Sequence, residues 1–438
     1  MNTTMKTTMR FKLVNTLSLF FITAAPLATA AVDVTKTRDG YTLEQSQTYS
    51  SATGYKELLG GDSVTSWWAE NISRTMLTAV LPNRLPASTF ETDLDEWPLK
   101  LEAVTADTHL GEITLSEAIN DPRAAVKAMI ILHKGKVVFE TYPGLHPANS
   151  HLWASVAKPT AALLIEQLID EGKLNDSDRV DTYLPDFAGT ALGETTVQQL
   201  LDMVPGSDTH DSPSTRRDPD SVATRYYRAE FDEAYKDGKV ETVREILQGA
   251  GRTGPAGERF EYSSGITQML VFIAEAVTNQ SWSDAFDERV WSHVRADGAL
   301  QVHLAPDGMA MAHGIVSSRL RDLARYGLLY TPYWSQVADK QVVSDAAMAR
   351  IVNAEHNREA YAKGDGQRFT PLLGEAPVAN SRQWDAIYAD GGMFKGGLFG
   401  QGLYVSPEEG IVIAYYSTAP ASPLHRFVRP LSKALTQE

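Results

Sequence analysis

Residues 153–159 read Trp-Ala-Ser-Val-Ala-Lys-Pro. Together with two motifs later in the chain, this stretch indicates the fold class. A serine hydroxyl is a weak nucleophile and needs a neighbouring base. Residues three apart lie on one face of a helix, so Lys158 can reach the Oγ of Ser155 without help from the rest of the chain. A lysine shielded from water can lose its proton and act as that base. The stretch therefore predicts a Ser–Lys pair at the start of a helix, where the missing N–H of Pro159 costs little.

The segments around this stretch predict strands as well as helices. Apolar residues recur at helical spacing over 155–171, and Gly172 stops the run. Residues 128–142 carry two apolar runs around a polar turn with a glycine, which is typical of a β-hairpin. A second hairpin is expected over 402–416. Further helices are expected over 196–203, 240–248, 266–277 and 423–435.

A tyrosine that could serve the Ser–Lys pair lies about a hundred residues further on, in Tyr262-Ser263-Ser264. A phenol near such a pair can carry a proton to the leaving group. The pattern is weak by itself, because residues 49–51 and 415–417 also fit it. Chain order favours Tyr262, since it follows the Ser–Lys pair and precedes a helix in the helical middle of the chain.

The third motif lies in the glycine-rich stretch 391–400, which contains Lys395-Gly396-Gly397. Glycines let a substrate approach a strand backbone closely, and backbone N–H groups there can hold an oxyanion. The alternative is an ordinary turn that leads into the last hairpin. Each motif is weak alone: Ser-x-x-Lys is expected about twice by chance in a chain of this length.

Taken in order, the three motifs resemble those of the penicillin-recognising serine hydrolases. These include class C β-lactamases, D-alanyl-D-alanine carboxypeptidases, related esterases and 6-aminohexanoate-dimer hydrolases. Residues 197–206 and 313–327 are similar to two further segments of that family. The resemblance covers residues 115–430 and favours the aminohexanoate-hydrolase and esterase branches. It implies an α/β (α+β) fold of the β-lactamase type, with an antiparallel sheet flanked by helices and an inserted helical lobe.

The resemblance also implies a catalytic role for each motif. Ser155 would attack a carbonyl carbon and form an acyl-enzyme, and Lys158 would be the general base. Tyr262 would relay the proton and help to activate the deacylating water. The oxyanion hole would consist of the backbone N–H groups of Ser155 and Leu398. No metal ion and no cofactor is implied.

Substrate binding would fall to Ser264, Lys395, Gly396 and Gly397, two of which depart from the family pattern. Many β-lactamases and carboxypeptidases have Asn at the place of Ser264 and Thr at the place of Gly396, where these side chains bind the substrate's amide and carboxylate. Losing both contacts weakens recognition of penicillins and D-Ala-D-Ala ends. We therefore expect a small-molecule substrate with a short ester or linear amide. A β-lactamase or D-alanyl-D-alanine carboxypeptidase is the alternative.

The order of the expected elements indicates how the chain is divided. Strands near both ends with helices between them suggest one sheet, assembled from both ends, beside a helical lobe. We assign 111–171 and 295–438 to the α/β domain and 172–294 to the lobe. Residues 31–110 are expected to be an N-terminal extension that packs on this body.

The first thirty residues have the pattern of a cleavable signal peptide. Lys6, Arg10 and Lys12 precede an apolar run over 13–27, and Ala28-Thr29-Ala30 is a small-x-small cleavage site. The run is too short and too broken to span a bilayer stably; a retained N-terminal anchor is the alternative. We expect cleavage after Ala30, export to the periplasm or medium, and no stable membrane anchor thereafter.

Composition excludes several other classes of protein. The 438 residues are 43% hydrophobic and 22% charged, which is typical of a soluble globular protein. The absence of cysteine excludes disulfides, cysteine nucleophiles and thiolate metal sites. The net charge of -15 repels phosphate backbones, so nucleic acid is not an expected partner. No pattern indicates an oligomeric state.

The remaining candidates are weaker. His303 and His313 flank an irregular stretch and could approach a site, but the ten histidines lack a metal-ligand spacing, and a lone histidine is more often structural. The polar loop 209–226 could cover the site or be an ordinary connection. Gly-x-Ser-x-Gly is absent, which disfavours an α/β-hydrolase elbow. A catalytically idle binding or sensor protein on the same fold is the alternative of another class.

Overall fold

The computed structural model describes residues 40–437 apart from Thr53. The predicted signal peptide, residues 1–30, lies outside these described residues. Within the described part of the chain, every helix is too short or too polar to cross a bilayer.

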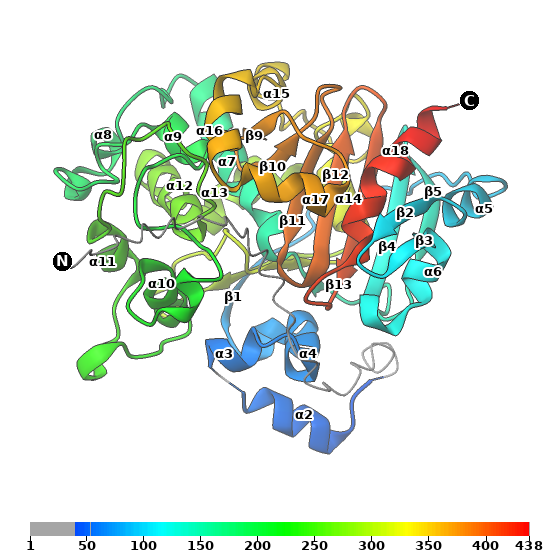
Figure 1. Cartoon of the computed structure of the whole chain (residues 1–438), viewed down its shortest axis with the longest axis horizontal. Helices are drawn as coiled ribbons and strands as arrows, with labels where there is room; N and C mark the ends of the chain where they lie inside the picture. Colours follow the sequence, from blue (N-terminus) through cyan, green and yellow to red (C-terminus); the bar gives the residue numbers. More distant parts are fainter. Residues whose placement is uncertain (1–39, 53, 438) are drawn as a thin grey trace, which may run out of the picture. The chain divides into compact units, whose positions relative to one another are not determined.

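An antiparallel sheet of seven strands forms the centre of the fold (Figure 1). Strand β4 pairs with β13 from His133 opposite Ile411 to Ala128 opposite Tyr416, so the two ends of the sequence meet in mid-sheet. This confirms the prediction of a sheet assembled from both ends, and hairpins β4–β5 and β12–β13 confirm the two expected hairpins. In spatial order the strands are β5 (Lys136–Thr141), β4 (Val126–His133), β13 (Ile411–Ser417), β12 (Gln401–Ser406), β11 (Met393–Gly397), β10 (Trp384–Ile387) and β9 (Ala379–Ser381).

The helices cover this sheet and fill the middle of the chain. Those before the middle are α2 (Leu43–Ser50), α3 (Tyr55–Leu58), α4 (Ser63–Asn71), α5 (Trp97–Glu102), α6 (Leu115–Asn120) and α7 (Lys158–Asp170). Those of the middle are α8 (Val180–Tyr183), α9 (Val197–Leu201), α10 (Val222–Glu230), α11 (Val243–Gln248), α12 (Ser264–Thr278) and α13 (Trp282–Arg289). The last are α14 (Leu320–Leu328), α15 (Asp345–Val352), α16 (Arg358–Lys363), α17 (Phe369–Leu373) and α18 (Val428–Thr436).

Both faces of the large sheet are buried, which explains why its central strands are almost continuously apolar. An added Cβ on Gly327 of α14 would lie 2.9 Å from Leu403 of β12, so helix and strand pack closely. The next residue of that strand, Tyr404, donates its hydroxyl to Ser432 of α18 at 3.2 Å. Since successive side chains of a strand point to opposite faces, α14 and α18 cover opposite sides. Each large apolar side chain buried in this way contributes about 1.5–3 kcal/mol.

Two smaller sheets correct the expectation of a single sheet. One has the order β1 (Leu77–Leu81), β7 (Leu300–Leu304), β8 (Val316–Ser318), β6 (His151–Leu152), and the other is the pair β2 (Thr105–Thr108) and β3 (Gly111–Thr114). Strands of two to five residues carry too little alternation to be recognised from sequence. Although β1 of the expected N-terminal extension pairs with β7, the division into extension, α/β domain and lobe stays a prediction.

The expected helices are present, mostly with shorter bounds. The helix predicted from Ser155 begins with a 3-10 turn, Ala154–Ala157, before α7 proper. The loop predicted over 209–226 is wrong at its end, because α10 begins at Val222. Its N-cap, Ser221, accepts the N–H of Thr224 at 3.1 Å, and such a cap stabilises a helix by about 1 kcal/mol.

The helices α7 and α12 pack against each other and begin at the same place in the fold. Lys158, the first residue of α7, contacts Ser264, the first residue of α12, at 3.1 Å between Nζ and Oγ. Two motifs that are about a hundred residues apart in the sequence are therefore neighbours in space.

Candidate active site

Ser155 lies in a tight turn between β6 and α7. The turn is held at Trp153, whose backbone N–H donates to the carbonyl of Val316 at 2.8 Å and whose indole N–H donates to Ser318 at 2.9 Å. Ala154 has φ of +47°, a left-handed conformation that costs a residue other than glycine about 1–3 kcal/mol. The half-buried Ser155 then lines a cleft of about 680 Å³. Strain of this kind is typical of functional sites.

Lys158 is completely buried, and its Nζ lies 3.3 Å from the Oγ of Ser155. Burial lowers the pKa of Lys158 well below its ordinary value, because the charged ammonium loses its hydration. The positive charge of Lys395 lowers the pKa further, against the opposing effect of Asp211 and Asp385. The predicted pair is therefore brought together, and burial favours the neutral form of Lys158.

Hydrogen bonds determine where the lone pair of a neutral Lys158 points. The Ser264 hydroxyl donates to the Asp211 carboxylate at 3.1 Å, which leaves its oxygen to accept from Lys158 at 3.1 Å. The carbonyl of His313 accepts a second N–H of Lys158 at 2.7 Å. A neutral amine has only two N–H donors, so its lone pair is left for the hydroxyl of Ser155.

Asp211 is the ionised anchor of this network. Burial raises its pKa, but the charge and hydrogen bonds of Arg216, together with the Tyr227 hydrogen bond and the charge of Lys158 when protonated, outweigh burial, and the pKa of Asp211 is lowered to about 2. Its Oδ1 accepts from Arg216 Nε at 2.5 Å, and its Oδ2 accepts from the Tyr227 hydroxyl at 2.5 Å. Sequence reasoning missed Asp211 and Tyr227. Their only signal was their position in or next to the polar loop 209–226, because no motif spacing connects them with Lys158.

Tyr262 lies directly before α12, whose N-cap, Ser263, accepts the N–H of Ile266 at 3.2 Å. Three basic side chains surround its ring: the Nζ of Lys395 and the Cζ of Arg368 lie 4.7 and 5.0 Å from the centroid, and the Nζ of Lys158 lies 5.2 Å from it. The motif predicted around Tyr262 thus combines a helix cap with a phenol at the centre of the site.

The phenol of Tyr262 remains protonated at neutral pH. Burial raises its pKa well above the ordinary value and Asp385 acts in the same direction, whereas a hydrogen bond with Ser155 and the charge of Arg368 lower it by less. A protonated phenol beside Ser155 can donate or relay a proton, but it cannot accept one as a base. Lys158 is therefore the candidate for the general base.

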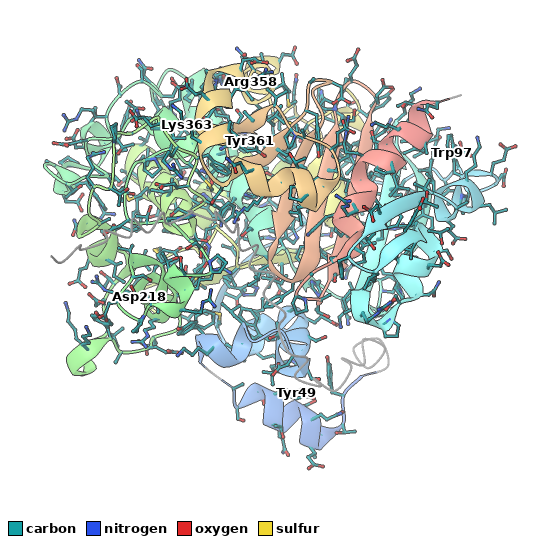
Figure 2. The ribbon with its side chains drawn as sticks, viewed as in Figure 1. Tyr49, Trp97, Asp218, Arg358, Tyr361 and Lys363 are labelled. Atoms are coloured by element: carbon teal, nitrogen blue, oxygen red, sulfur yellow. The ribbon has the colours of Figure 1, made fainter. Side chains whose placement is uncertain are left out.

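The two competing tyrosine motifs lie elsewhere. Tyr49, labelled in Figure 2, belongs to α2. Its ring packs against Tyr41 and Trp67. Tyr415 belongs to β13, and its hydroxyl lies 2.6 Å from the Nδ1 of His425. Neither tyrosine lines the cleft that contains Ser155.

Lys395 is buried at the centre of β11 and bound to Asp385 of β10, a residue that sequence reasoning missed. Its Nζ lies 2.5 Å from Oδ1 of Asp385, while Oδ2 accepts the backbone N–H of Gly396 at 3.0 Å. Burial lowers the pKa of Lys395, and Asp385 opposes that effect. The carboxylate therefore ties the side chain and the strand backbone together, while Gly396 itself lines the cleft.

Gly397 fits against the turn that carries Ser155. An added Cβ would lie 2.8 Å from the carbonyl oxygen of Trp153 and 3.0 Å from the Cβ of Ala154. The glycine thus allows β11 to reach the nucleophile, and Leu398 follows at the cleft. Ser155 and Leu398 both line the cleft. The predicted oxyanion hole is thus compatible with the geometry, and it stays a prediction.

The remaining predicted residues lie near the site without lining the cleft. Ser264 is buried behind Lys158, so its part in substrate binding stays a prediction. His313 contributes its carbonyl, while its ring Nε2 lies 2.5 Å from Glu230. His303 is buried in β7 between Thr78 and Ser317, at 2.9 and 3.0 Å, and burial lowers its pKa to about 3.

The cleft lining is rich in arginine. It includes Arg216, Arg368 and Arg426, and its one carboxylate, Asp385, is paired with Lys395. Within the described ranges, no group of three or more His, Asp or Glu is placed to bind a metal ion. The site thus combines a serine, a lysine and a tyrosine with several arginine side chains.

Comparison with known proteins agrees with this arrangement. The sequence matches the β-lactamase family over residues 117–438. The chain therefore belongs to the β-lactamase family and is a serine hydrolase, and the resemblance inferred from its three motifs is confirmed.

Individual proteins of known name are similar to this chain in sequence or in fold. The chain is 28% identical to a 6-aminohexanoate-dimer hydrolase of Paenarthrobacter ureafaciens over 356 residues, which are 81% of this chain and 85% of the relative. The fold is similar to that of a Bacillus anthracis protein assigned as a 6-aminohexanoate-dimer hydrolase, with a TM-score of 0.71, 23% identity and coverage of 87% and 96%. A family VIII carboxylesterase has a TM-score of 0.54 at 12% identity, with coverage of 78% and 99%. These likenesses confirm the predicted fold class.

Proposed function

We propose that this protein is an exported hydrolase of short esters or linear amides that works through an acyl-enzyme on Ser155. The observation that carries the proposal is the buried Lys158, whose Nζ lies 3.3 Å from Oγ of Ser155 and whose other polar neighbours use up its N–H donors. Export rests on the charged, apolar and small-residue pattern of residues 1–30.

The proposed reaction follows from the positions of the protons. Lys158 takes the hydroxyl proton of Ser155 as Oγ bonds to the substrate carbonyl carbon. The N–H groups of Ser155 and Leu398 hold the resulting oxyanion. Collapse of this intermediate breaks the ester or amide bond, and the leaving group receives a proton through Tyr262, which Lys158 reprotonates. Water then attacks the acyl carbon and gives a proton to Lys158 along the same path. The bond between that carbon and Oγ breaks, the acid leaves, and Lys158 returns the proton to Oγ of Ser155.

The proposed substrate class rests on the identity of two residues, Gly396 and Ser264. Gly396 lines the cleft and offers no hydroxyl for a carboxylate, and the Ser264 hydroxyl is already engaged by Lys158 and Asp211. Both features support a substrate other than a penicillin or a D-Ala-D-Ala end. Similarity to a 6-aminohexanoate-dimer hydrolase supports the linear amide. A β-lactamase or D-alanyl-D-alanine carboxypeptidase remains the alternative, as does a binding or sensor protein without catalysis.

Hydrolysis of 4-nitrophenyl butyrate by the chain without residues 1–30 tests the proposal, with a chromogenic cephalosporin in parallel. We expect ester turnover that Ser155→Ala abolishes and that Ser214→Ala, a change of an exposed serine, retains. A fluorophosphonate should label the wild type at Ser155. Efficient cephalosporin turnover would instead support the β-lactamase alternative, and absence of both turnover and labelling would support the binding protein. Export is tested by mass spectrometry of the chain recovered outside the cytoplasm, whose first residue should be Ala31.

A further inference from the structure

Arg368 occupies a fixed position in the cleft that contains Ser155. Three hydrogen bonds hold its segment against the segment of Tyr262. The N–H of Phe260 donates to Ala360 at 3.0 Å, the N–H of Asp365 donates to Phe260 at 2.9 Å, and the N–H of Tyr262 donates to the Asp365 carboxylate at 3.0 Å. These bonds join residues about a hundred positions apart, so Arg368 is placed by the fold and not by a mobile loop tip.

Close packing makes this arrangement possible. An added Cβ on Gly364 would lie 2.0 Å from the carbonyl oxygen of Phe260, so only glycine lets the two segments approach so closely. The segment follows α16, which carries Arg358, Tyr361 and Lys363 (Figure 2). The ring of Tyr361 stacks on Phe260, with centroids 5.4 Å apart, and anchors the helix that leads to Arg368.

The guanidinium of Arg368 is held by aromatic rings and left without hydrogen-bond partners. Its Cζ lies 5.0 Å from the ring centroids of both Tyr262 and Phe369. Its Nη1 lies 3.9 Å from Asp365, beyond hydrogen-bond distance, and that carboxylate oxygen is already used by His210 and Tyr262. Among the described residues, no hydrogen bond uses a side-chain donor of Arg368, and 42% of its side chain is exposed. Its planar fork of donors is therefore available to a ligand in the cleft.

The other arginines of the cleft are committed to protein groups. Arg216 is bound to the Asp211 carboxylate at 2.5 Å, and Arg426 donates to the carbonyl of Pro371 at 2.7 Å and pairs with Asp107 at 3.2 Å. The chain as a whole has a net charge of -15, whereas the cleft contains the guanidinium of Arg368, which makes no hydrogen bond to another residue in the described part of the chain. This local positive charge favours an anionic ligand.

We propose that Arg368 binds a carboxylate of the substrate, so that the enzyme acts on short esters or linear amides that carry a free carboxylate. A guanidinium matches a carboxylate with two parallel hydrogen bonds. Its Cζ and the Nζ of Lys158 lie 5.0 and 5.2 Å from the same Tyr262 centroid, which limits their separation to about 10 Å. A short linear molecule can therefore reach both Arg368 and Ser155. This inference rests on the proposed function for the reaction, but the binding site can be tested without it.

The test measures binding by the non-reactive Ser155→Ala protein, with hexanoate and hexanamide as ligands in a ligand-observed NMR titration. The two ligands have the same length and differ in charge. We expect hexanoate to bind at least about tenfold more tightly, since bonds to a charged group are the stronger ones. Adding Arg368→Met should remove this preference. Adding Arg358→Met, which removes an exposed charge on α16 with 58% of its side chain accessible, should keep it. Arg368→Gln serves as the second variant if Arg368→Met fails to fold.

Equal binding of the two ligands, or a preference that survives both substitutions of Arg368, would overturn the inference. Turnover of 4-nitrophenyl butyrate separates this outcome from failure of the proposed function. A carboxylate preference in a protein that neither hydrolyses the ester nor is labelled at Ser155 by a fluorophosphonate supports the site and contradicts the hydrolase proposal. Ester turnover without a preference for the carboxylate supports the hydrolase proposal and contradicts the carboxylate site at Arg368.

Discussion

Replacing Asp211 by Asn should move the acid limb of the pH profile of kcat/KM to lower pH. Lys158 must be neutral to accept the proton of Ser155, so activity falls as pH drops below the pKa of Lys158. The negative charge of Asp211 stabilises the ammonium and raises that pKa. Removing the charge lowers the pKa of Lys158, and the amine then stays neutral to lower pH.

The size of the shift follows from the geometry. Ser264 Oγ lies 3.1 Å from Oδ2 of Asp211 and 3.1 Å from Nζ of Lys158, so the two charges are at most about 6 Å apart. At an effective dielectric constant of about 20, charges about 6 Å apart interact by about 2.8 kcal/mol, which corresponds to about 2 pH units. Relaxation and water entry reduce this value, so we expect a shift of about one to two units.

The assay is the pH dependence of kcat/KM for 4-nitrophenyl butyrate, followed at the isosbestic wavelength of nitrophenol. Asp218→Asn is the matched control: it removes the same charge from an exposed residue of the same loop, which is labelled in Figure 2 and does not act on Lys158. Its acid limb should coincide with that of the wild type. An acid limb that stays in place or moves to higher pH in Asp211→Asn would refute the assignment of Lys158 as the base.

Two further predictions concern the late strand. Gly397→Ala should lower the free energy of unfolding by about 1–3 kcal/mol and slow fluorophosphonate labelling, because the new Cβ meets the backbone oxygen of Trp153 at 2.8 Å. Gly254→Ala has no atom within 4 Å and should be neutral in urea denaturation; equal effects would contradict this reasoning. Asp385→Ala should cost about 3–5 kcal/mol by leaving Lys395 buried without its carboxylate, and the double change Asp385→Leu, Lys395→Met should recover most of that loss. A loss below about 1 kcal/mol on urea denaturation would show that the pair is not buried as described.

The contact between Ser155 and Lys158 was predictable because its geometry is local. Three residues along a helical turn bring Lys158 to Ser155 in any fold that keeps the turn. The helix that begins after Tyr262 was predictable for a similar reason, since a serine at the N-cap and an apolar run of helical spacing indicate a helix. The two hairpins were predictable from apolar runs around short turns.

The short strands of the second sheet were not predictable in the same way. The strand β6 has only two residues, and its partner β8 lies more than 160 positions away. Such pairing is decided by the packing of the whole chain and leaves almost no periodic signal. The α10 helix was missed because its first turn follows a polar stretch that resembles a loop, although Ser221 supplies a regular cap.

The local pattern of the sequence specifies most of the helices and hairpins and three motifs: a serine with a lysine one turn away, a tyrosine before a capped helix, and a glycine-rich strand. Only the tertiary structure decided how these parts act on one another. The burial that lowers the pKa of Lys158, the Asp211–Ser264 contact that directs its lone pair, and the position of the Arg368 guanidinium over the Tyr262 ring all depend on residues distant in sequence. Electrostatic and hydrogen-bond effects depend on distance and solvent exposure, and both quantities exist only once the chain has packed.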